Sequence, residues 1–275
     1  MKIVLSFILL SLCFGQDWTD DVTLPNKSQK ATVSQYIGLT DIRVEYHRPY
    51  VKNRKIWGEL VPYNKIWRAG ANDNTVISFT HEVQIAGKKV PAGTYGLHLI
   101  PSEKDWALIL SSNYTSWGSY FYKEEEDVLR VSLKTETAPH SELLTFTFDR
   151  MTDHSATLAL IWEKRRVNIP ISVDVKHVVF TNLKNELRSV AAFSWQGWHE
   201  AANYLAENNY ELDYALGWIE ESIKREKNFQ NLATKAHILN LKNKKADAKK
   251  LINEALSAAP EKAKPYLKKK YKQLF

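Results

Sequence analysis

Residues 75–86 read TVISFTHEVQIA, and apolar and polar side chains alternate in two runs within them, 75–79 and 82–86. Alternation with a period of two is typical of a strand that buries one face and leaves the other in water. A glycine and two lysines follow at 87–89, and such residues favour the tight turns that join antiparallel strands. The stretch therefore predicts two short strands of an antiparallel sheet.

Similar short runs extend on both sides of this stretch, with no helical periodicity between them. They predict further strands over 42–46, 96–100, 106–111, 128–133, 143–148, 155–162 and 167–173. Many short strands separated by turn residues indicate a β-sandwich, with a β-barrel as the alternative. We therefore expect an antiparallel β-sandwich domain over residues 31–173, after a linker over 16–30.

Beyond Asp174 the spacing of apolar residues becomes helical. Trp198, Ala202 and Leu205 share one helix face, and comparable faces recur up to Pro260. The offsets match two units of a tetratricopeptide-like repeat, and a helical bundle docked on the sheet is the alternative. The prediction is an α+β multidomain chain with helical hairpins over 195–275, and residues 174–194 form a connection or a first helix.

The N-terminus has the layout of a signal peptide. Lys2 precedes an apolar run that ends at Phe14, and the chain turns polar at Gln16. We expect removal of residues 1–15 and a secreted or periplasmic protein. Lipid anchoring at Cys13 is less favoured, because Leu12 stands where a lipoprotein signal has a small residue. Cleavage before Gln16 leaves no cysteine, so the mature chain has no disulfide.

Basic residues are concentrated at the C-terminal end. The chain carries a net charge of +7, yet residues 223–275 alone hold 15 lysines or arginines against 4 acidic residues. Clustered lysines are usually a solvated helix face, and they also attract anionic surfaces in a salt-dependent way. The basic tail is a candidate for association with an anionic envelope surface, and the helical repeats are a candidate site for a protein partner. We expect no transmembrane helix in the mature chain. The export signal disfavours nucleic acid as a partner.

Residues 46–72 are the densest in arginine and tryptophan, and they read as a long loop between strands, a kind of segment that often carries function. Arginines there can bind a carboxylate or phosphate, and aromatic rings can stack on a sugar. The alternative is structural, with arginines paired locally and rings anchored in the core. The candidate binding residues are Arg48, Lys55, Trp57, Trp67, Arg68, Asn72, Tyr95, His98, Trp117 and Tyr120.

Four aromatic residues stand between 117 and 122, namely Trp117, Tyr120, Phe121 and Tyr122. They predict either a stacking platform for a glycan or a hydrophobic cluster that closes one end of the sandwich, and we favour the cluster. The acidic run that follows is most simply a solvated loop.

Six segments together resemble the bacterial secreted proteins grouped as domain of unknown function 2911. The resemblance covers about residues 28–172 and implies an extracytoplasmic β-domain, sometimes with a helical extension, but no particular activity. His47 departs from the small residue expected before Arg48 and Pro49. The segments that carry the resemblance are Arg48-Pro49, Lys55 to Gly58, Leu60 to Tyr63, Trp67 to Asn72, Pro91 to Leu97 and Trp117 to Tyr120.

Established catalytic motifs do not occur in the sequence. There is no serine elbow, no HExxH motif and no phosphate-binding glycine loop, and no two histidines stand at metal-ligand spacing. We therefore expect no catalytic residue, no metal and no cofactor. A ligand- or protein-binding module is the first hypothesis, and a hydrolase acting on an envelope glycan or peptide, with Arg68 and either His47 or His98, is the second. A purely structural role for the 67–72 motif is the third.

Overall fold

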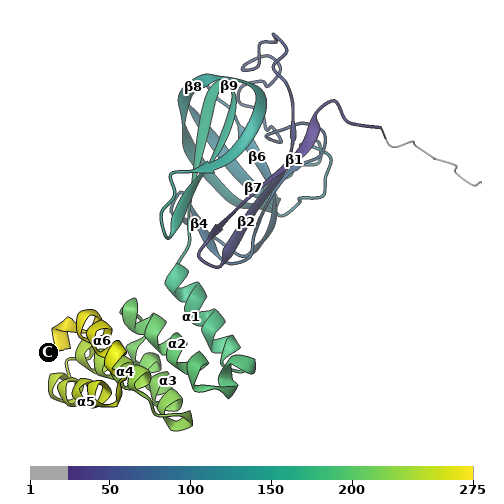
Figure 1. Ribbon diagram of the computed structural model, residues 1–275. Helices are drawn as coiled ribbons and strands as arrows, with labels where there is room; N and C mark the ends of the chain where they lie inside the picture. Colours follow the sequence, from purple (N-terminus) through teal and green to yellow (C-terminus); the bar gives the residue numbers. More distant parts are fainter. Residues whose placement is uncertain (1–23, 275) are drawn as a thin grey trace, which may run out of the picture.

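The computed structural model describes residues 24–274, and these form a β-domain followed by a helical domain (Figure 1). The predicted signal peptide and Cys13 lie outside the described residues. Nine strands of the described part form one antiparallel sheet in the order β1-β2-β3-β6-β7-β8-β9-β4-β5. Their bounds are β1 Gln29–Ile37, β2 Thr40–Arg48, β3 Thr75–Phe79, β4 Val83–Ile85, β5 Lys88–Val90, β6 Gly93–Ile100, β7 Asp105–Ser111, β8 Asp127–Asp149 and β9 Ser155–Ser172.

The alternating runs of the sequence are strands in the structure. In β3, which matches its predicted range, Thr75, Ile77 and Phe79 are buried while the two residues between them are partly exposed. β1 and β5 were not predicted. The inward side chains of β1 include the small Ala31 and Val33, which are only partly buried, and β5 is three residues long, so neither gives a clear apolar pattern.

Between 128 and 173 the sequence predicts four strands where the structure has two long ones, β8 and β9. The pairing of β8 with β9 shifts register between Thr137 and Ser141 and again between Ser141 and Thr145. Such irregularities bend a strand and interrupt its alternation without ending it. The predicted breaks are therefore bends of continuous strands.

The sheet closes on itself just after β2. The Val51 amide donates to the Glu142 carbonyl at 2.8 Å, and the Leu144 amide donates to the Pro49 carbonyl at 3.1 Å. Figure 1 shows the long β8 and β9 curving so that both ends of the sheet enclose one core. The two layers of the predicted sandwich are thus continuous through these strands.

Four tryptophans meet in this core. Trp57 packs edge-on against Trp106 and Trp162, with ring centroids 4.7 and 5.7 Å apart, and Trp67 stacks on Trp162 at 5.9 Å. Trp106 and Trp162 belong to strands, whereas Trp57 and Trp67 belong to the loop over residues 49–74. Because two of its rings are part of the core, this long loop is fixed in place along its length.

The helical prediction for the C-terminal part is confirmed, and α1 occupies most of the connecting segment. α2–α3 and α4–α5 form two antiparallel hairpins with their own apolar clusters, and α6 packs at the end (Figure 1). Within residues 24–274, no helix has the length and apolar character needed to cross a membrane. The helices are α1 Val175–Glu186, α2 Trp195–Glu207, α3 Leu212–Arg225, α4 Phe229–Leu241, α5 Lys245–Ala258 and α6 Lys264–Lys270.

The two domains meet at the start of α1. Asp174 caps this helix by accepting a hydrogen bond from the His177 amide at 3.1 Å. Val175 and Val178 pack against the core of the β-domain. Gly38 lies so close to Val175 that a Cβ there would come within 2.7 Å of its side chain. The first turn of α1 is therefore seated on the β-domain.

Candidate functional site

Trp67 determines where the following arginine lies. The Trp67 amide and carbonyl each bond to Leu99 of β6 at 2.8 Å, so the loop runs for one residue as an added strand. The indole ring points into the core and its Nε1 donates to the Gly70 carbonyl at 3.2 Å. Because the backbone and the ring of Trp67 are fixed, the side chain of the next residue, Arg68, points away from the core.

The tight turn after Arg68 depends on small residues. Ala69 is fully buried with a φ of 53°, and its carbonyl accepts from the Thr75 hydroxyl at 3.2 Å. A Cβ at Gly70 would come within 2.8 Å of that hydroxyl oxygen and 3.1 Å of the His47 carbonyl. The order of residues in the motif over 67–72 is thus required by the way this turn packs against β2 and β3.

A second loop, residues 112–123 between β7 and β8, covers the arginine. The Arg68 guanidinium lies 5.3 Å from the centre of the Trp117 ring, and its Nη1 donates to the Asn72 carbonyl. Gly118 has a φ of +65°, and a Cβ there would lie 2.8 Å from the guanidinium carbon. Glycine therefore both permits this turn and leaves room for the arginine.

The Arg68 side chain is half-buried and lacks an acidic partner. Among residues 24–274 it makes no ion pair with a carboxylate. Asp73, the nearest acidic residue in the sequence, lies 3.5 Å from His47 Nε2 instead. A half-buried guanidinium without a counter-charge favours binding of an external anion.

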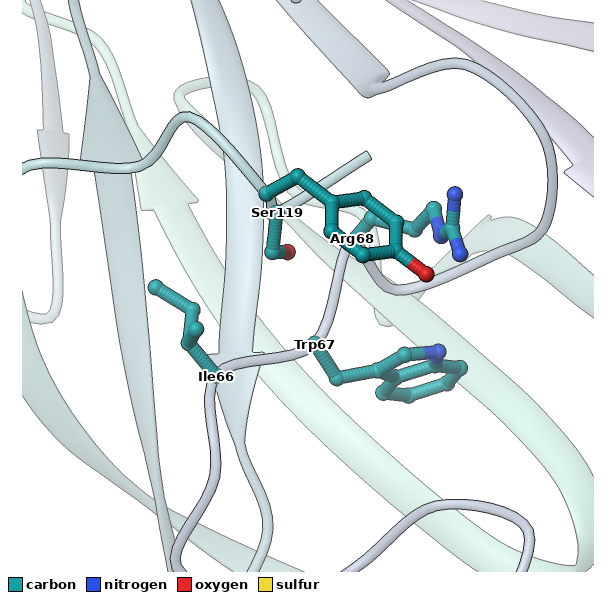
Figure 2. A pocket seen from close by; sticks show the side chains of 5 residues that line it. Ile66, Trp67, Arg68 and Ser119 are labelled. Carbon is teal, nitrogen blue, oxygen red and sulfur yellow. The ribbon is translucent and has the colours of Figure 1, made fainter. Parts of the chain in front are cut away.

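The two loops enclose a cavity of about 250 Å³ (Figure 2). We call it the arginine cleft. Figure 2 shows the Trp67 ring below the Arg68 guanidinium. The lining residues are Ile66, Trp67, Arg68, Ser119 and Tyr120. A cationic group, a hydroxyl and aromatic rings thus converge on one open space.

His98 lies beneath the cleft, on β6. It is 2% exposed, and its Nδ1 lies 3.1 Å from the Ser119 hydroxyl. Burial, and then the nearby charge of Arg68, lower the pKa of His98 from 6.5 to about 4. The imidazole is therefore neutral at neutral pH, and it holds Ser119 in position by a hydrogen bond.

The aromatic residues of the second loop do not close the end of the sheet. Trp117, Tyr120 and Phe121 are 54%, 74% and 64% exposed, so the predicted hydrophobic cluster is wrong. Trp117 and Tyr120 stack on each other, 5.4 Å apart and 14° from parallel. Tyr122 is the exception, because it turns inward and its hydroxyl donates to Asp127 at 3.1 Å. Trp117 and Tyr120 form an exposed aromatic wall beside the cleft.

Four predicted binding residues lie away from the cleft. Arg48 donates to the Leu144 carbonyl and the Thr145 hydroxyl of β8, which fixes β2 to β8. The Tyr95 hydroxyl bonds within its own turn, to the Pro91 carbonyl. Trp57 is a core residue and Lys55 forms an exposed ion pair with Glu59 at 2.9 Å. These contacts match the structural alternative, in which arginines pair locally and aromatic rings anchor the loop in the core.

Asn72 supports the cleft without lining it. It has a φ of 57°, its carbonyl accepts from Arg68, and its side-chain amide donates to the Ser28 carbonyl at 3.2 Å. The same amide lies 3.0 Å from His47 Nδ1. His47 is 5% exposed and thus belongs to the packing behind the cleft. Trp67, Arg68, His98, Trp117 and Tyr120 are the predicted residues that the fold brings together.

Ser119 and Ile66 are lining residues that the candidate list did not include. Ser119 stands inside a segment that carried the family resemblance, but a lone serine has no distinctive spacing. Its contact with His98 identifies Ser119, and this contact joins residues 21 positions apart that only the folded chain brings together. Among residues 24–274 no group of three histidine, cysteine or acidic side chains is placed to hold a metal ion.

These observations define a class of protein, an antiparallel β-domain with an arginine cleft and a helical extension. Residues 28–171 match the model of the family described as "Protein of unknown function (DUF2911)", which is more than half of the chain, so the chain belongs to this family. No curated protein and no solved structure matches it.

Proposed function

We propose that the β-domain is a ligand-binding module of a secreted or envelope-associated protein, and that the arginine cleft binds an anionic group. The observation that carries the proposal is the guanidinium of Arg68, which lines an open cavity, has its position fixed by Trp117, Gly118 and Asn72, and lacks an acidic partner in the described chain. Preformed donors bind a ligand without the entropic cost of ordering a flexible side chain.

A hydrolase is the second candidate, because the Ser119 hydroxyl and the His98 ring have the contact of a nucleophile and its base. Two features favour binding instead. A histidine with a pKa of about 4 is a weak base at neutral pH, and Arg68 disfavours the imidazolium that catalysis would form. Among residues 24–274 no carboxylate pairs with His98 to stabilise that charge, as a triad requires.

The helical domain is the part that we propose to bind a protein partner. The segment between α1 and α2 presents Val190 and Phe193, which are 75% and 84% exposed. The carbonyl of Ala192, between them, accepts hydrogen bonds from Trp198 Nε1 and Arg225 Nε at 3.0 and 2.9 Å. Two apolar side chains held on a fixed backbone suit a protein interface.

The experiment for the cleft is a thermal-shift screen of the mature chain, residues 16–275, against small carboxylates, phosphorylated compounds, glycans and peptidoglycan fragments. A ligand that binds the native state raises the melting temperature. We expect an anionic compound to raise it, and Arg68→Ala to abolish the shift. Lys55→Ala, which removes an exposed cation outside the cleft, is the matched control.

The same variant separates binding from a structural role. Arg68→Ala removes one hydrogen bond and one ring contact, so it should cost on the order of 1 kcal/mol of folding free energy. In a chain of this size that lowers the melting temperature by about 2–4 °C. A much larger fall, with no anion bound by the wild-type protein, would contradict the proposal and support a purely structural motif.

A further inference from the structure

We infer that the ligand of the arginine cleft is an acidic sugar residue, a pyranose ring that carries one carboxylate. The inference rests on the proposed function, which is that the cleft binds an anion at Arg68. It adds the chemical class of that ligand. Three properties of the cleft carry it: the number of its charges, its size, and the arrangement of aromatic faces and hydroxyl groups around the guanidinium.

The charge of the cleft fits one carboxylate. Arg68 is the one cationic residue among those that line it. Phosphate groups are held by several donors together, such as clusters of arginines and lysines or the N-terminus of a helix. The lining segments 66–68 and 119–120 are loops that begin no helix. A guanidinium that has given Nη1 to the Asn72 carbonyl retains donors for a single carboxylate group.

The size of the cleft fits one ring. Its volume of about 250 Å³ is below the roughly 300–1,000 Å³ of sites that enclose a whole drug-sized ligand. It is also open to solvent beside the exposed Tyr120. A single sugar unit can enter while the rest of a glycan continues into water.

The aromatic wall favours a sugar over a peptide. Trp117 and Tyr120 lie nearly parallel to each other, and Tyr120, on the cleft side, is 74% exposed. An exposed flat ring offers its face to the C–H groups on one side of a pyranose, and that contact removes apolar area from water on both partners. Recognition of a peptide side chain would require a deep apolar pocket, and Ile66 is the one aliphatic lining residue.

The polar edge of the cleft supplies groups for sugar hydroxyls. Ser119 is oriented by its contact with His98 Nδ1 at 3.1 Å. A hydroxyl both donates and accepts, as sugar hydroxyls do, and one that is already oriented binds at a smaller entropic cost. The cleft therefore places a charge, a hydroxyl and an aromatic face around one ring-sized space.

The test is titration calorimetry of the mature chain with four probes: methyl glucuronide, methyl glucoside, acetate and inorganic phosphate. We expect methyl glucuronide to bind at least about tenfold more tightly than each of the others, because it alone uses both the guanidinium and the ring contacts. Digalacturonate, which carries two acidic sugar units, should bind at the same site.

Variants of the aromatic wall complete the test. Tyr120→Ala should weaken methyl glucuronide about tenfold and leave acetate binding within about twofold, whereas Tyr120→Phe should retain the sugar. Tyr36→Ala is the control, because Tyr36 is an exposed ring on β1 outside the cleft.

The possible failures are distinguishable. If acetate binds as well as methyl glucuronide and Arg68→Ala abolishes both, the cleft binds carboxylates and the sugar inference is wrong. Preference for phosphate, or equal affinity for methyl glucoside, also overturns it. If none of the anions binds, the proposed function fails together with the inference.

Discussion

At the residue scale, Arg68 is available to a ligand because its neighbour in space is a glycine. Any side chain at position 118 would occupy the volume of the guanidinium. Both residues belong to segments that carried the family resemblance, but the sequence does not reveal that the segments touch. Their contact depends on the turn at 69–72 and on the path of the loop after β7, which are properties of the packed chain.

Gly118→Ala should therefore reduce ligand binding strongly while destabilising the fold only modestly. The alanine would adopt an unfavourable positive φ, at a cost of about 1 kcal/mol, and would displace the guanidinium. Gly87→Ala is the matched control, since Gly87 has a φ of +78° with nothing near its Cβ position. Calorimetry and urea unfolding of both variants check this. Equal affinities in the two variants would contradict the role of Gly118.

His98 should make folding stability depend on pH between about 6.5 and 4. The folded protein keeps His98 neutral down to its pKa of about 4, whereas the unfolded chain takes up the proton below about 6.5. The unfolded state then binds more protons, so stability falls as the pH drops through this window, by up to about 3 kcal/mol. Burial also lowers the pKa values of His199 and His237, and these add in the same direction.

His98→Gln should flatten this dependence, because glutamine keeps a hydrogen-bonding group but does not titrate. Urea unfolding at pH 7, 6 and 5.5 measures it, above the range in which most carboxyl groups become protonated. The wild-type protein and the variant should differ most at pH 7 and converge at lower pH. If the stabilities of the wild-type protein and the variant fell in parallel with pH, groups other than His98 would cause the acid sensitivity.

At the scale of elements, the strands were more predictable than the loop that they hold. Period-two alternation places β2, β3 and β4 because each has one buried face, whereas β6 and β7 are short apolar runs that are buried on both faces. It found parts of β8 and β9 but not their continuity, because register shifts change which face of β8 is buried. It missed β1, whose inner residues include the small and only partly buried Ala31 and Val33. For the loop over 49–74 the sequence indicates its existence and its aromatic content, but not which rings enter the core.

Trp57 anchors that loop, so Trp57→Ala should be among the most destabilising substitutions of the β-domain. It would leave a cavity beside Trp106 and Trp162 and cost about 3–5 kcal/mol. Trp117→Ala removes a ring of the same size that is 54% exposed, and should cost less than about 1 kcal/mol. Chemical denaturation compares the two. Similar losses would show that the loop does not depend on its core tryptophan.

At the scale of the whole molecule, the two domains have separate apolar cores and meet mainly at the first turn of α1. The cleft lies entirely within the β-domain. A chain truncated after Glu186, which keeps α1, should therefore bind the ligand of the cleft with an affinity within about twofold of the complete protein. Calorimetry with both chains tests this. A large loss of affinity would mean that the helical hairpins contribute to the site.

The closure of the sheet after β2 also bears on the order in which the protein folds. Most neighbouring strands follow each other in the sequence, so their contacts form between nearby residues. The contacts that join the chain after β2 to β8 span about 90 residues, as between Lys52 and Glu142, and closing such a span costs more entropy before it is repaid. The loop that carries Arg68 follows directly after this junction. We therefore expect a partly folded chain to have strands before it has a cleft, so that ligand binding reports complete folding of the β-domain.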